Sequence, residues 1–484
     1  MSLSSSLSAA VSGLTVSARA AELVSSNVAN AMTEGYVRRD LELAPRSLAG
    51  QGHGVRVAAV VRDVDLGLLN DRRVANAQSA DRDLRAGFLL SFENALGQPE
   101  AAGSLAGRIA TLDAALVAAV SRPESEARLT EVLNAARQLA TQLKSTGDLV
   151  QTARAQADDS IENQVRALND SLSRIQKLNV EIRSSLVSSN DASALMDLRQ
   201  QEIDRISQIV PLRQIDRDHG QVALYSTQGA PLLEGKPATI GFVGVGLITP
   251  DMTLQSGALS GLTLNGVAVQ TDASGILSGG TLGASFALRD ELTVTAQTRL
   301  DAVARELVTR FSDPAVDPSL APGDAGIFTD FGAAFDPANE AGLAQRIRLN
   351  ESVDPARGGA LWRLRDGVNA ASPGPSGDSR LLGALQGALS SARVPVSGGF
   401  SNRPTSLAAL GATLVSITAT ERLSAESEAS FATARATALS ERQNQMGVDT
   451  DAELQKLLLI EQAYAANARV ITTVESMLDA IMSI

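Results

Sequence analysis

The chain contains no cysteine and only two histidines. Without cysteine it has no disulfide, thiol nucleophile or thiolate metal site, and His53 and His219 lie far apart in the sequence, each beside a glycine. Gly50, Gly52 and Gly54 lack the following helix and acidic residue that a dinucleotide-binding fingerprint needs. We therefore predict no metal, no cofactor and no enzyme active site. Paired carboxylates are the one catalytic arrangement that an acidic chain leaves open.

Long apolar runs and an excess of positive charge are also missing. No segment approaches ~18 uninterrupted apolar residues, and the first residues lack the basic and hydrophobic regions of a cleaved signal. The formal net charge of -12 argues against a phosphate-binding surface, because nucleic-acid binders cluster Lys and Arg. We expect neither a membrane nor a nucleic acid as partner.

Aromatic residues make up 3% of the chain, whereas 44% of its residues are hydrophobic. The core must therefore be built from Ala, Leu, Val and Ile, and the small side chains among these allow helices to pack closely. At 484 residues the chain exceeds the size of a single compact core, which stops growing near ~250 to 300 residues. We expect several domains or an elongated molecule.

Both ends of the chain carry apolar residues at alternating steps of four and three, which is the spacing of a coiled-coil seam. The N-terminal seam includes Leu3, Leu7, Leu14, Val24 and Val28, and the C-terminal seam includes Leu457, Ile460, Tyr464, Asn467, Ile471, Val474 and Leu478. Asn467 is the single strongly polar position of its seam and is suited to fixing the register. The two stripes could pack on each other, on neighbouring copies, or, as ordinary surface helices, on their own domain.

The middle of the chain predicts a helical body interrupted by a β-rich stretch. Ser121 and Glu124 resemble a capping box at a helix start, and a four-three seam from Ile161 to Leu186 predicts a helix of roughly 30 residues. Residues 263–267 carry an Asn-Gly hairpin signal, and helical periodicity returns from Leu288 and again from about Ser406.

These patterns predict a mainly α fold with a β-rich insertion, that is, an α+β chain. We divide it into a terminal coiled-coil domain (1–45 with 445–484), a helical-bundle body (46–215 with 286–312 and 396–444), a β-rich hairpin region (216–285) and an irregular or reduced outer insertion (313–395).

Two terminal motifs resemble the flagellar rod, hook and hook-associated axial proteins. Residues 25–39, SSNVANAMTEGYVRR, are similar to that family's SNNIAN signature followed by TPGYSRQ, and residues 461–471, EQAYAANARVI, are similar to its QxAYxANARVI ending. Asn27 and Asn30 can bond local backbone, Gly35 is a flexible position and Tyr36 an anchoring aromatic. Glu34 replaces the usual Pro, which loosens the turn. Ser26, Val37 and Arg39 also depart from the signature.

Internal stretches narrow the resemblance to the hook-associated members found at the hook–filament junction. Residues 168–182 resemble the INxLLxxIAxLNxxI helix of those members, residues 190–205 their NDLLDxRD region, and residues 280–290 their GxLGALLxxRD motif. The resemblance covers most of 1–312 and 440–484, and 313–405 matches poorly.

The resemblance implies an elongated, multidomain axial subunit with paired terminal helices. It also implies export through the flagellar type III apparatus without signal cleavage, and an extracellular place in the flagellum. The implied partners are other copies of the chain, the hook protein, hook-associated protein 3 and an export chaperone on the C-terminal helix. The assembly interface would comprise the terminal seam residues with Asn27, Asn30, Gly35 and Tyr36. Two alternatives remain open: another axial protein, such as the hook subunit or hook-associated protein 3, or an exported enzyme or adhesin with its activity in 313–405.

Overall fold

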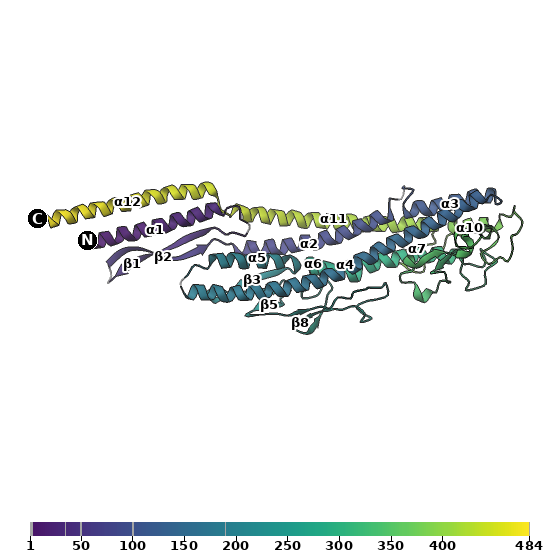
Figure 1. The fold of residues 1–484 in the computed structure, drawn as a ribbon, viewed down its shortest axis with the longest axis horizontal. Coiled ribbons are helices and arrows are strands. Elements are labelled where there is room, and N and C mark those ends of the chain that lie inside the picture. Colours follow the sequence, from purple (N-terminus) through teal and green to yellow (C-terminus); the bar gives the residue numbers. More distant parts are fainter. Residues whose placement is uncertain (1–2, 34, 49–50, 99–100, 189, 484) are drawn as a thin grey trace.

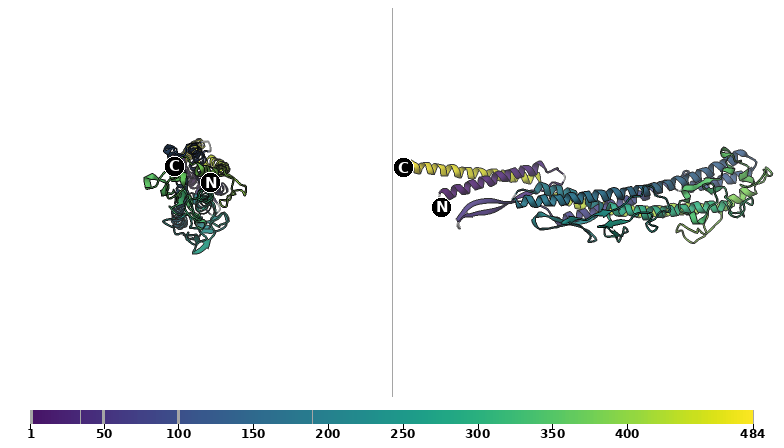
Figure 2. Two further views of the ribbon diagram at one scale, coloured as in Figure 1. Left: turned by 90° about the vertical axis from the view of Figure 1, so that its right-hand side faces the viewer. Right: turned by 60° about the horizontal axis from the view of Figure 1, so that its bottom comes forward.

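A computed structural model shows an elongated, mainly helical molecule with both termini at one end (Figure 1). It describes the whole chain apart from residues 1–2, 34, 49–50, 99–100, 189 and 484. The narrow cross-section appears when the molecule is viewed along its length (Figure 2). The predicted α+β class and elongated shape are confirmed.

The two terminal helices form an arm that projects from the body. Helix α1 spans Leu3–Ala29 and α12 spans Thr450–Met482, and they lie side by side (Figure 1). Asp449 caps α12 by accepting hydrogen bonds from the N–H groups of Asp451 and Ala452, at 3.0 and 3.1 Å, which fixes the start of this helix. The two helices predicted at the ends of the chain are therefore present, and they pack on each other.

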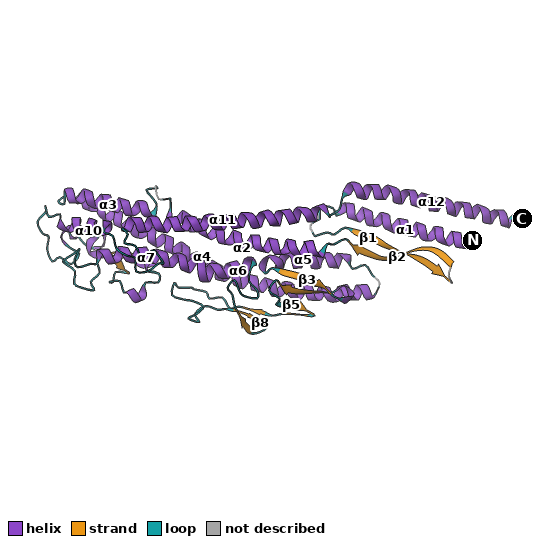
Figure 3. Ribbon diagram, turned by 180° about the vertical axis from the view of Figure 1, so that it is seen from behind, coloured by secondary structure: helices purple, strands orange, loops and turns teal. Residues whose placement is uncertain are grey.

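Long helices run the length of the body (Figure 3). Its helices are α2 (Leu66–Leu96), α3 (Leu105–Ser121), α4 (Glu126–Val187), α5 (Ser193–Ile209), α6 (Gly280–Ala287), α7 (Thr293–Phe311) and α11 (Leu407–Gln445), with the π-helical turn η2 (Leu288–Leu292) between α6 and α7. The helix predicted from about Ser406 is present as α11, and Ser406 caps it by accepting a hydrogen bond from the Ala409 N–H.

Helix α4 differs from its prediction in both start and length. Its 62 residues give a rod of about 93 Å at 1.5 Å per residue, twice the predicted length. Ser121 ends α3, and Ser125 stands at the N-cap of α4, so the predicted capping box at Ser121 is wrong. The helix continues through Gly147, which is buried against the Gln345 side chain, and tertiary packing there outweighs the low helix propensity of glycine.

The β-rich region forms two small antiparallel sheets beside α4. One contains β3 (Leu212–Asp216), β4 (Val222–Ser226), β5 (Pro231–Glu234) and β6 (Lys236–Pro237), and the other β7 (Ile240–Gly241), β8 (Leu262–Leu264) and β9 (Val267–Val269). A short 3-10 turn, η1 (Asp218–Gly220), joins β3 to β4. Asn265 and Gly266 have φ values of 51° and 82°, so the predicted two-residue hairpin is confirmed.

Residues 39–48 and 51–62 form the two strands of a β-hairpin that the sequence did not predict. Strands β1 (Arg39–Leu48) and β2 (Gln51–Arg62) pair antiparallel beside α1. Residues 46–62 had been assigned to the helical body, and that assignment is wrong. Valines at four positions between 55 and 61 explain the outcome, because β-branched residues favour extended structure.

The region 313–405 consists of short elements packed onto the distal end of the body. Its elements are β10 (Phe328–Asp330), η3 (Pro337–Asn339), α8 (Leu343–Arg346), β11 (Ile347–Leu349), η4 (Glu351–Val353), η5 (Pro355–Arg357), α9 (Arg363–Asp366) and α10 (Arg380–Ser390). Phe328, Leu343 and Leu382 are buried in the same core as side chains of α3, α4 and α7. A second core joins α4, α5 and α6 to the strands. In the described ranges, no helix is long and apolar enough to cross a membrane.

Candidate functional site

The terminal helices pack antiparallel, and this pairing is the candidate site. Gly13 of α1 lies against Asn467 of α12, while Asn27 near the end of α1 contacts Glu453 near the start of α12. The antiparallel direction places both chain ends at the tip of the arm (Figure 1).

The predicted interface residues in the N-terminal part of the chain are all at least half-buried. Val24 and Asn27 are buried, and the others are half-buried: Leu3, Leu7, Leu14, Val28, Asn30, Gly35 and Tyr36. The structure therefore brings these residues together along α1 and the turn that follows it. Gly35 has a φ of 78°, a conformation that glycine adopts without strain.

The predicted residues of α12 are less covered. Val474 is buried, and Leu457, Ile460, Asn467 and Ile471 are half-buried. Tyr464 and Leu478 are 48% and 39% exposed, so the pairing with α1 leaves part of the seam open. Further large apolar side chains on α12 are exposed as well: Leu454, Leu458, Leu459, Val470, Met477, Ile481 and Met482. We call this set, with Tyr464 and Leu478, the open face of α12.

Two glycines allow other elements to pack closely on α1: Gly13 lies where α12 contacts it, and Gly54 lies where β2 contacts it. A Cβ atom at Gly13 would lie 2.6 Å from the Asn467 amide nitrogen. On the hairpin side, a Cβ atom at Gly54 would lie 1.9 Å from Ser12 Oγ, and this hydroxyl accepts a hydrogen bond of 3.1 Å from the Val55 N–H. Helix α1 thus packs between α12 and β2; a methyl group at Gly13 would have to displace the Asn467 side chain, and one at Gly54 would meet Ser12 and the backbone of Ala9.

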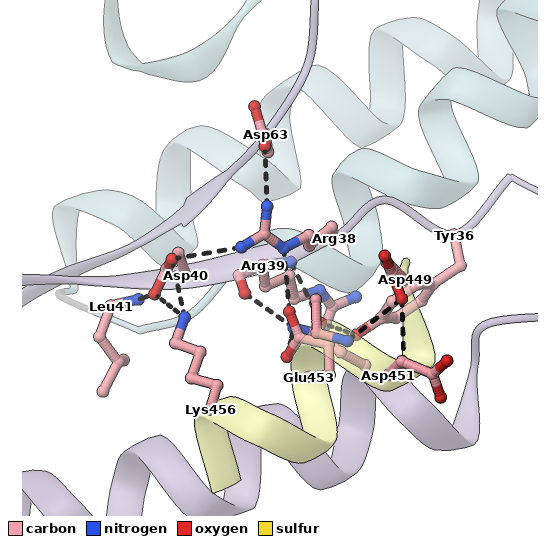
Figure 4. Close-up of polar contacts among 12 residues, drawn as sticks. Tyr36, Arg38, Arg39, Asp40, Leu41, Asp63, Asp449, Asp451, Glu453 and Lys456 are labelled. Atoms are coloured by element: carbon pink, nitrogen blue, oxygen red, sulfur yellow. Dashed lines mark hydrogen bonds and ion pairs between the residues drawn. The ribbon is translucent and has the colours of Figure 1, made fainter. Parts of the chain in front are cut away.

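A polar cluster ties the end of α1 to the start of α12 (Figure 4). Glu453 is only 2% exposed, and its carboxylate accepts hydrogen bonds from Arg38 Nε at 2.9 Å and from Asn27 Nδ2 at 3.1 Å. Asn27 also donates to the Arg39 carbonyl at 2.9 Å, and its Oδ1 accepts from the Arg39 N–H and the Tyr36 hydroxyl at 3.1 and 2.9 Å. We call Asn27, Tyr36, Arg38, Arg39 and Glu453 the Glu453 clasp.

The contacts of the clasp favour the charged form of Arg38. The hydrogen bond to Glu453 raises the pKa of Arg38 above its ordinary value, against the opposing effect of burial. Beside it, Lys456 of α12 bonds both carboxylate oxygens of Asp40 at 2.8 and 2.9 Å. Partial burial by itself would raise the pKa of Asp40. The hydrogen bond from Lys456, together with the Leu41 N–H and the charges of Lys456 and Arg38, outweighs this effect, so the pKa of Asp40 is lowered.

A second carboxylate joins the hairpin to the body. Asp197 of α5 accepts hydrogen bonds from Arg39 Nη2 at 2.6 Å and from Arg62 Nη2 and Nε at 2.6 and 3.0 Å. Burial lowers the pKa of Arg62, against the attraction of Asp197. Since Arg39 belongs to the Glu453 clasp, one continuous polar path runs from α12 through the hairpin to the body.

Sequence reasoning missed the charged members of this path. Arg38, Arg39 and Glu453 lie inside the two stretches of family resemblance, but their spacing carries no sign that they meet. Arg38 and Glu453 are 415 positions apart, and a salt bridge between such distant residues leaves no local pattern. In the described part of the chain, no group of three or more His, Cys, Asp or Glu residues is placed to hold a metal ion.

Two stretches of the chain match models of known protein families. Residues 89–314 match the family model of the helical domain of flagellar hook-associated protein FlgK, and residues 440–484 match that of the C-terminal part of the flagellar basal body rod FlgEFG proteins. The two stretches together span more than half of the chain. The chain is thus similar to flagellar hook-associated protein FlgK in its helical body and to flagellar rod proteins at its C-terminal end.

Three individual proteins show how far the similarity extends. Flagellar hook-associated protein 1 of Salmonella typhimurium is 28% identical over 243 residues, which are 49% of this chain and 44% of that relative. The match thus spans less than half the length of the relative. Flagellar hook-associated protein 1 of Bacillus subtilis is 22% identical over 490 residues, covering 94% of this chain and 93% of that relative. The hook junction protein FlgK from Burkholderia pseudomallei has 19% identity and a TM-score of 0.44, over 54% of this chain and 46% of that chain.

Proposed function

We propose that the chain is a structural subunit of the bacterial flagellum, which joins hook to filament and assembles through its terminal helices. The open face of α12 carries this proposal. Pairing with α1 leaves Leu458 and Leu459 60% and 65% exposed, on a helix whose sequence matches the flagellar rod C-terminal family. Exposed apolar rows of this kind mark protein contacts, and a self-assembling subunit supplies neighbouring copies to cover them.

The Glu453 clasp supports a mechanical role for the arm. Apolar seams by themselves allow slippage along a helix pair, whereas a buried carboxylate held by Arg38 and Asn27 fixes one register. Asp197 then links the hairpin to the body. A neighbouring subunit that binds the open face would therefore contact an arm in which the register of α1 on α12 and the connection to the body are both fixed.

A structural role is favoured over catalysis and over the other axial proteins. The family is one of structural flagellar proteins, and the match of 89–314 to the FlgK helical domain favours a junction subunit over the hook subunit or hook-associated protein 3. The region 313–405, where an exported enzyme would carry its activity, contributes its apolar side chains to the common core of the body.

The proposed partners are further copies of the chain, the hook protein and hook-associated protein 3. An export chaperone would cover the open face of α12 before assembly, because exposed apolar side chains on an unassembled subunit favour aggregation. Export would use the flagellar type III apparatus without cleavage of a signal, to an extracellular place at the hook–filament junction.

The test is complementation in a flagellate host that lacks its own junction protein. The full chain should restore filaments, and a tag on it should appear in electron micrographs as one band between hook and filament. Deletion of residues 1–30 or 458–484 should give hooks without filaments and filament subunits in the medium, while far-ultraviolet circular dichroism of the purified variant shows a folded body. Normal filaments from both deletions, or a tag spread along the hook, would contradict the proposal.

A further inference from the structure

A cavity of about 210 Å³, partly open to the surface, lies where the β-rich region and the 313–405 region meet the helices of the body. Helices α4 and α7 form two of its walls, and the rest comes from Pro250, from the segment before α8 and from Ser397. The cavity is far from the terminal arm, and nothing in the proposed junction role uses it.

Gln297 of α7 lines this cavity and carries an unsatisfied acceptor. The residue is 7% exposed, and its Nε2 donates a hydrogen bond of 2.9 Å to Asp301 Oδ1. Its Oε1 is buried and has no hydrogen-bond partner among the described residues. A buried amide oxygen without a partner destabilises the folded chain, so a donor that bonds to it would be stabilising.

Asp301 lines the same cavity and is 2% exposed. Its Oδ1 also accepts from the Ala344 N–H at 2.8 Å, and its Oδ2 accepts only from the Gly342 N–H, at 2.7 Å. A carboxylate offers about four acceptor positions, so one remains. In the described part of the chain Asp301 has no ion-pair partner, since the nearby Arg346 pairs with Asp330 at 2.8 Å.

The charges around the cavity leave an excess of carboxylates. Arg154 lines the cavity, but its guanidinium donates to the carbonyls of Arg289, Thr249, Pro250 and Met252. The charged groups around Arg154 and Asp301 are four guanidinium groups and six carboxylates: Arg154, Arg289, Arg305 and Arg346 against Asp158, Asp251, Asp290, Asp301, Asp330 and Glu340. Two negative charges are thus uncompensated locally.

We propose that this cavity binds a small cationic ligand through a primary ammonium group, which donates hydrogen bonds to Gln297 Oε1 and Asp301 Oδ2. A primary ammonium carries three N–H donors and one positive charge, matching one orphan amide oxygen and one unpaired carboxylate. The volume is several times the ~30 Å³ that one water occupies, so the space admits the carbon chain of a small amine. Binding would also stabilise the turn at Gly342, because Asp301 holds that turn.

The test uses the full chain and two cations that differ in N–H donors. Hydrogen exchange of amides 341–347 is followed at pH 7.5 in methylammonium chloride and in tetramethylammonium chloride at equal ionic strength. Methylammonium should slow exchange in this segment at least about twofold once it exceeds its dissociation constant, and tetramethylammonium, which has no N–H, should not. The effect should vanish in Gln297→Met. It should persist in Gln164→Met, because Gln164 lies on α4 outside the cavity lining and its amide is already bonded to Ser160, Ser285 and Thr281.

Equal exchange in the two salts would overturn the proposal and would mean that water, and no amine, occupies the cavity. An equal response of Gln297→Met and the intact chain to methylammonium would also overturn it. If Gln297→Met does not fold, the comparison of the two salts on the intact chain still decides.

Discussion

Gly13 of α1 lies so close to Asn467 of α12 that a methyl group on residue 13 would come within 2.6 to 2.8 Å of three atoms of the Asn467 amide. Asn467 is the one strongly polar residue of the C-terminal seam. The pairing of a glycine with this amide marks a close approach of the two helices along the arm, in addition to the Glu453 clasp at the base of the arm.

Gly13→Ala should loosen the arm, although alanine is the better helix former by up to about 1 kcal/mol. The new methyl group forces Asn467 aside at a cost of about 1–3 kcal/mol. Hydrogen exchange of the α1 amides should become faster. The double variant Gly13→Ala with Asn467→Ala makes room for the methyl group, and its α1 amides should exchange at least as slowly as in the parent chain. Slower exchange in the single variant would show that the close contact does not hold.

Glu453→Gln should destabilise the start of α12 far more than Lys456→Met, which removes the exposed Lys456–Asp40 ion pair nearby. The substitution leaves Arg38 without its buried carboxylate partner, at an expected loss of about 1–3 kcal/mol in local opening free energy. Lys456→Met removes a pair whose members are 33% and 51% exposed, so its loss should stay below about 1 kcal/mol. Native-state hydrogen exchange over residues 453–460 measures both, and equal losses would contradict the clasp.

Gly54→Ala should detach the hairpin from α1. The added Cβ would lie 1.9 Å from Ser12 Oγ and 3.0 Å from the Ala9 Cα, at a φ of 99° that alanine rarely adopts. Gly229→Ala is the matched control, because Gly229 has a φ of 89° and no atom within 4 Å of the added Cβ. Tryptic cleavage at Arg56 should accelerate in Gly54→Ala and keep its rate in Gly229→Ala. An unchanged rate in both would contradict the packing of β2 on α1.

Asp301 should make the body less stable as the pH rises from about 4 to about 7. Burial raises the pKa of its carboxyl from 3.8 to about 6, against the hydrogen bonds from the N–H groups of Ala344 and Gly342. The folded chain then holds a proton in this range that the unfolded chain has lost, so stability is fully present below 3.8 and falls through pH 6, by about 3 kcal/mol in total. Asp301→Asn should be less stable than the parent chain at low pH, and urea unfolding should show that the gap narrows as pH rises. A gap that stays constant between pH 4 and 7.5 would refute this.

The features that the sequence predicted well are those with a local signal. The four-three spacing located the terminal helices and placed Val24 and Val474 in their packed faces, and Asn265-Gly266 located the β8–β9 turn. Each depends on residues within one or two turns of the chain. The positions of the remaining seam residues as an assembly interface stay a prediction.

The features that the sequence did not predict depend on distant neighbours. Helix α4 continues through Gly147 because Gln345 packs against it, and the Glu453 clasp joins residues more than 400 positions apart. Tyr464 belongs to the predicted C-terminal seam and is nevertheless 48% exposed, which the spacing of the seam does not indicate. The hairpin over 39–62 had a local signal in its valines, which the sequence analysis did not weigh against the helical surroundings.

The most direct test of the junction role is a charge on the open face of α12. Leu458→Asp with Leu459→Asp changes two exposed side chains, so the monomer should fold and be exported as before, and Phe431→Asp on α11, where Phe431 is 76% exposed, serves as the control. The measurement counts filaments per hook in a host that lacks its own junction protein, with the secreted amount of each variant measured in parallel. The account predicts bare hooks with the α12 variant and normal filaments with the control. Normal filaments with the α12 variant, secreted at parental levels, would contradict it.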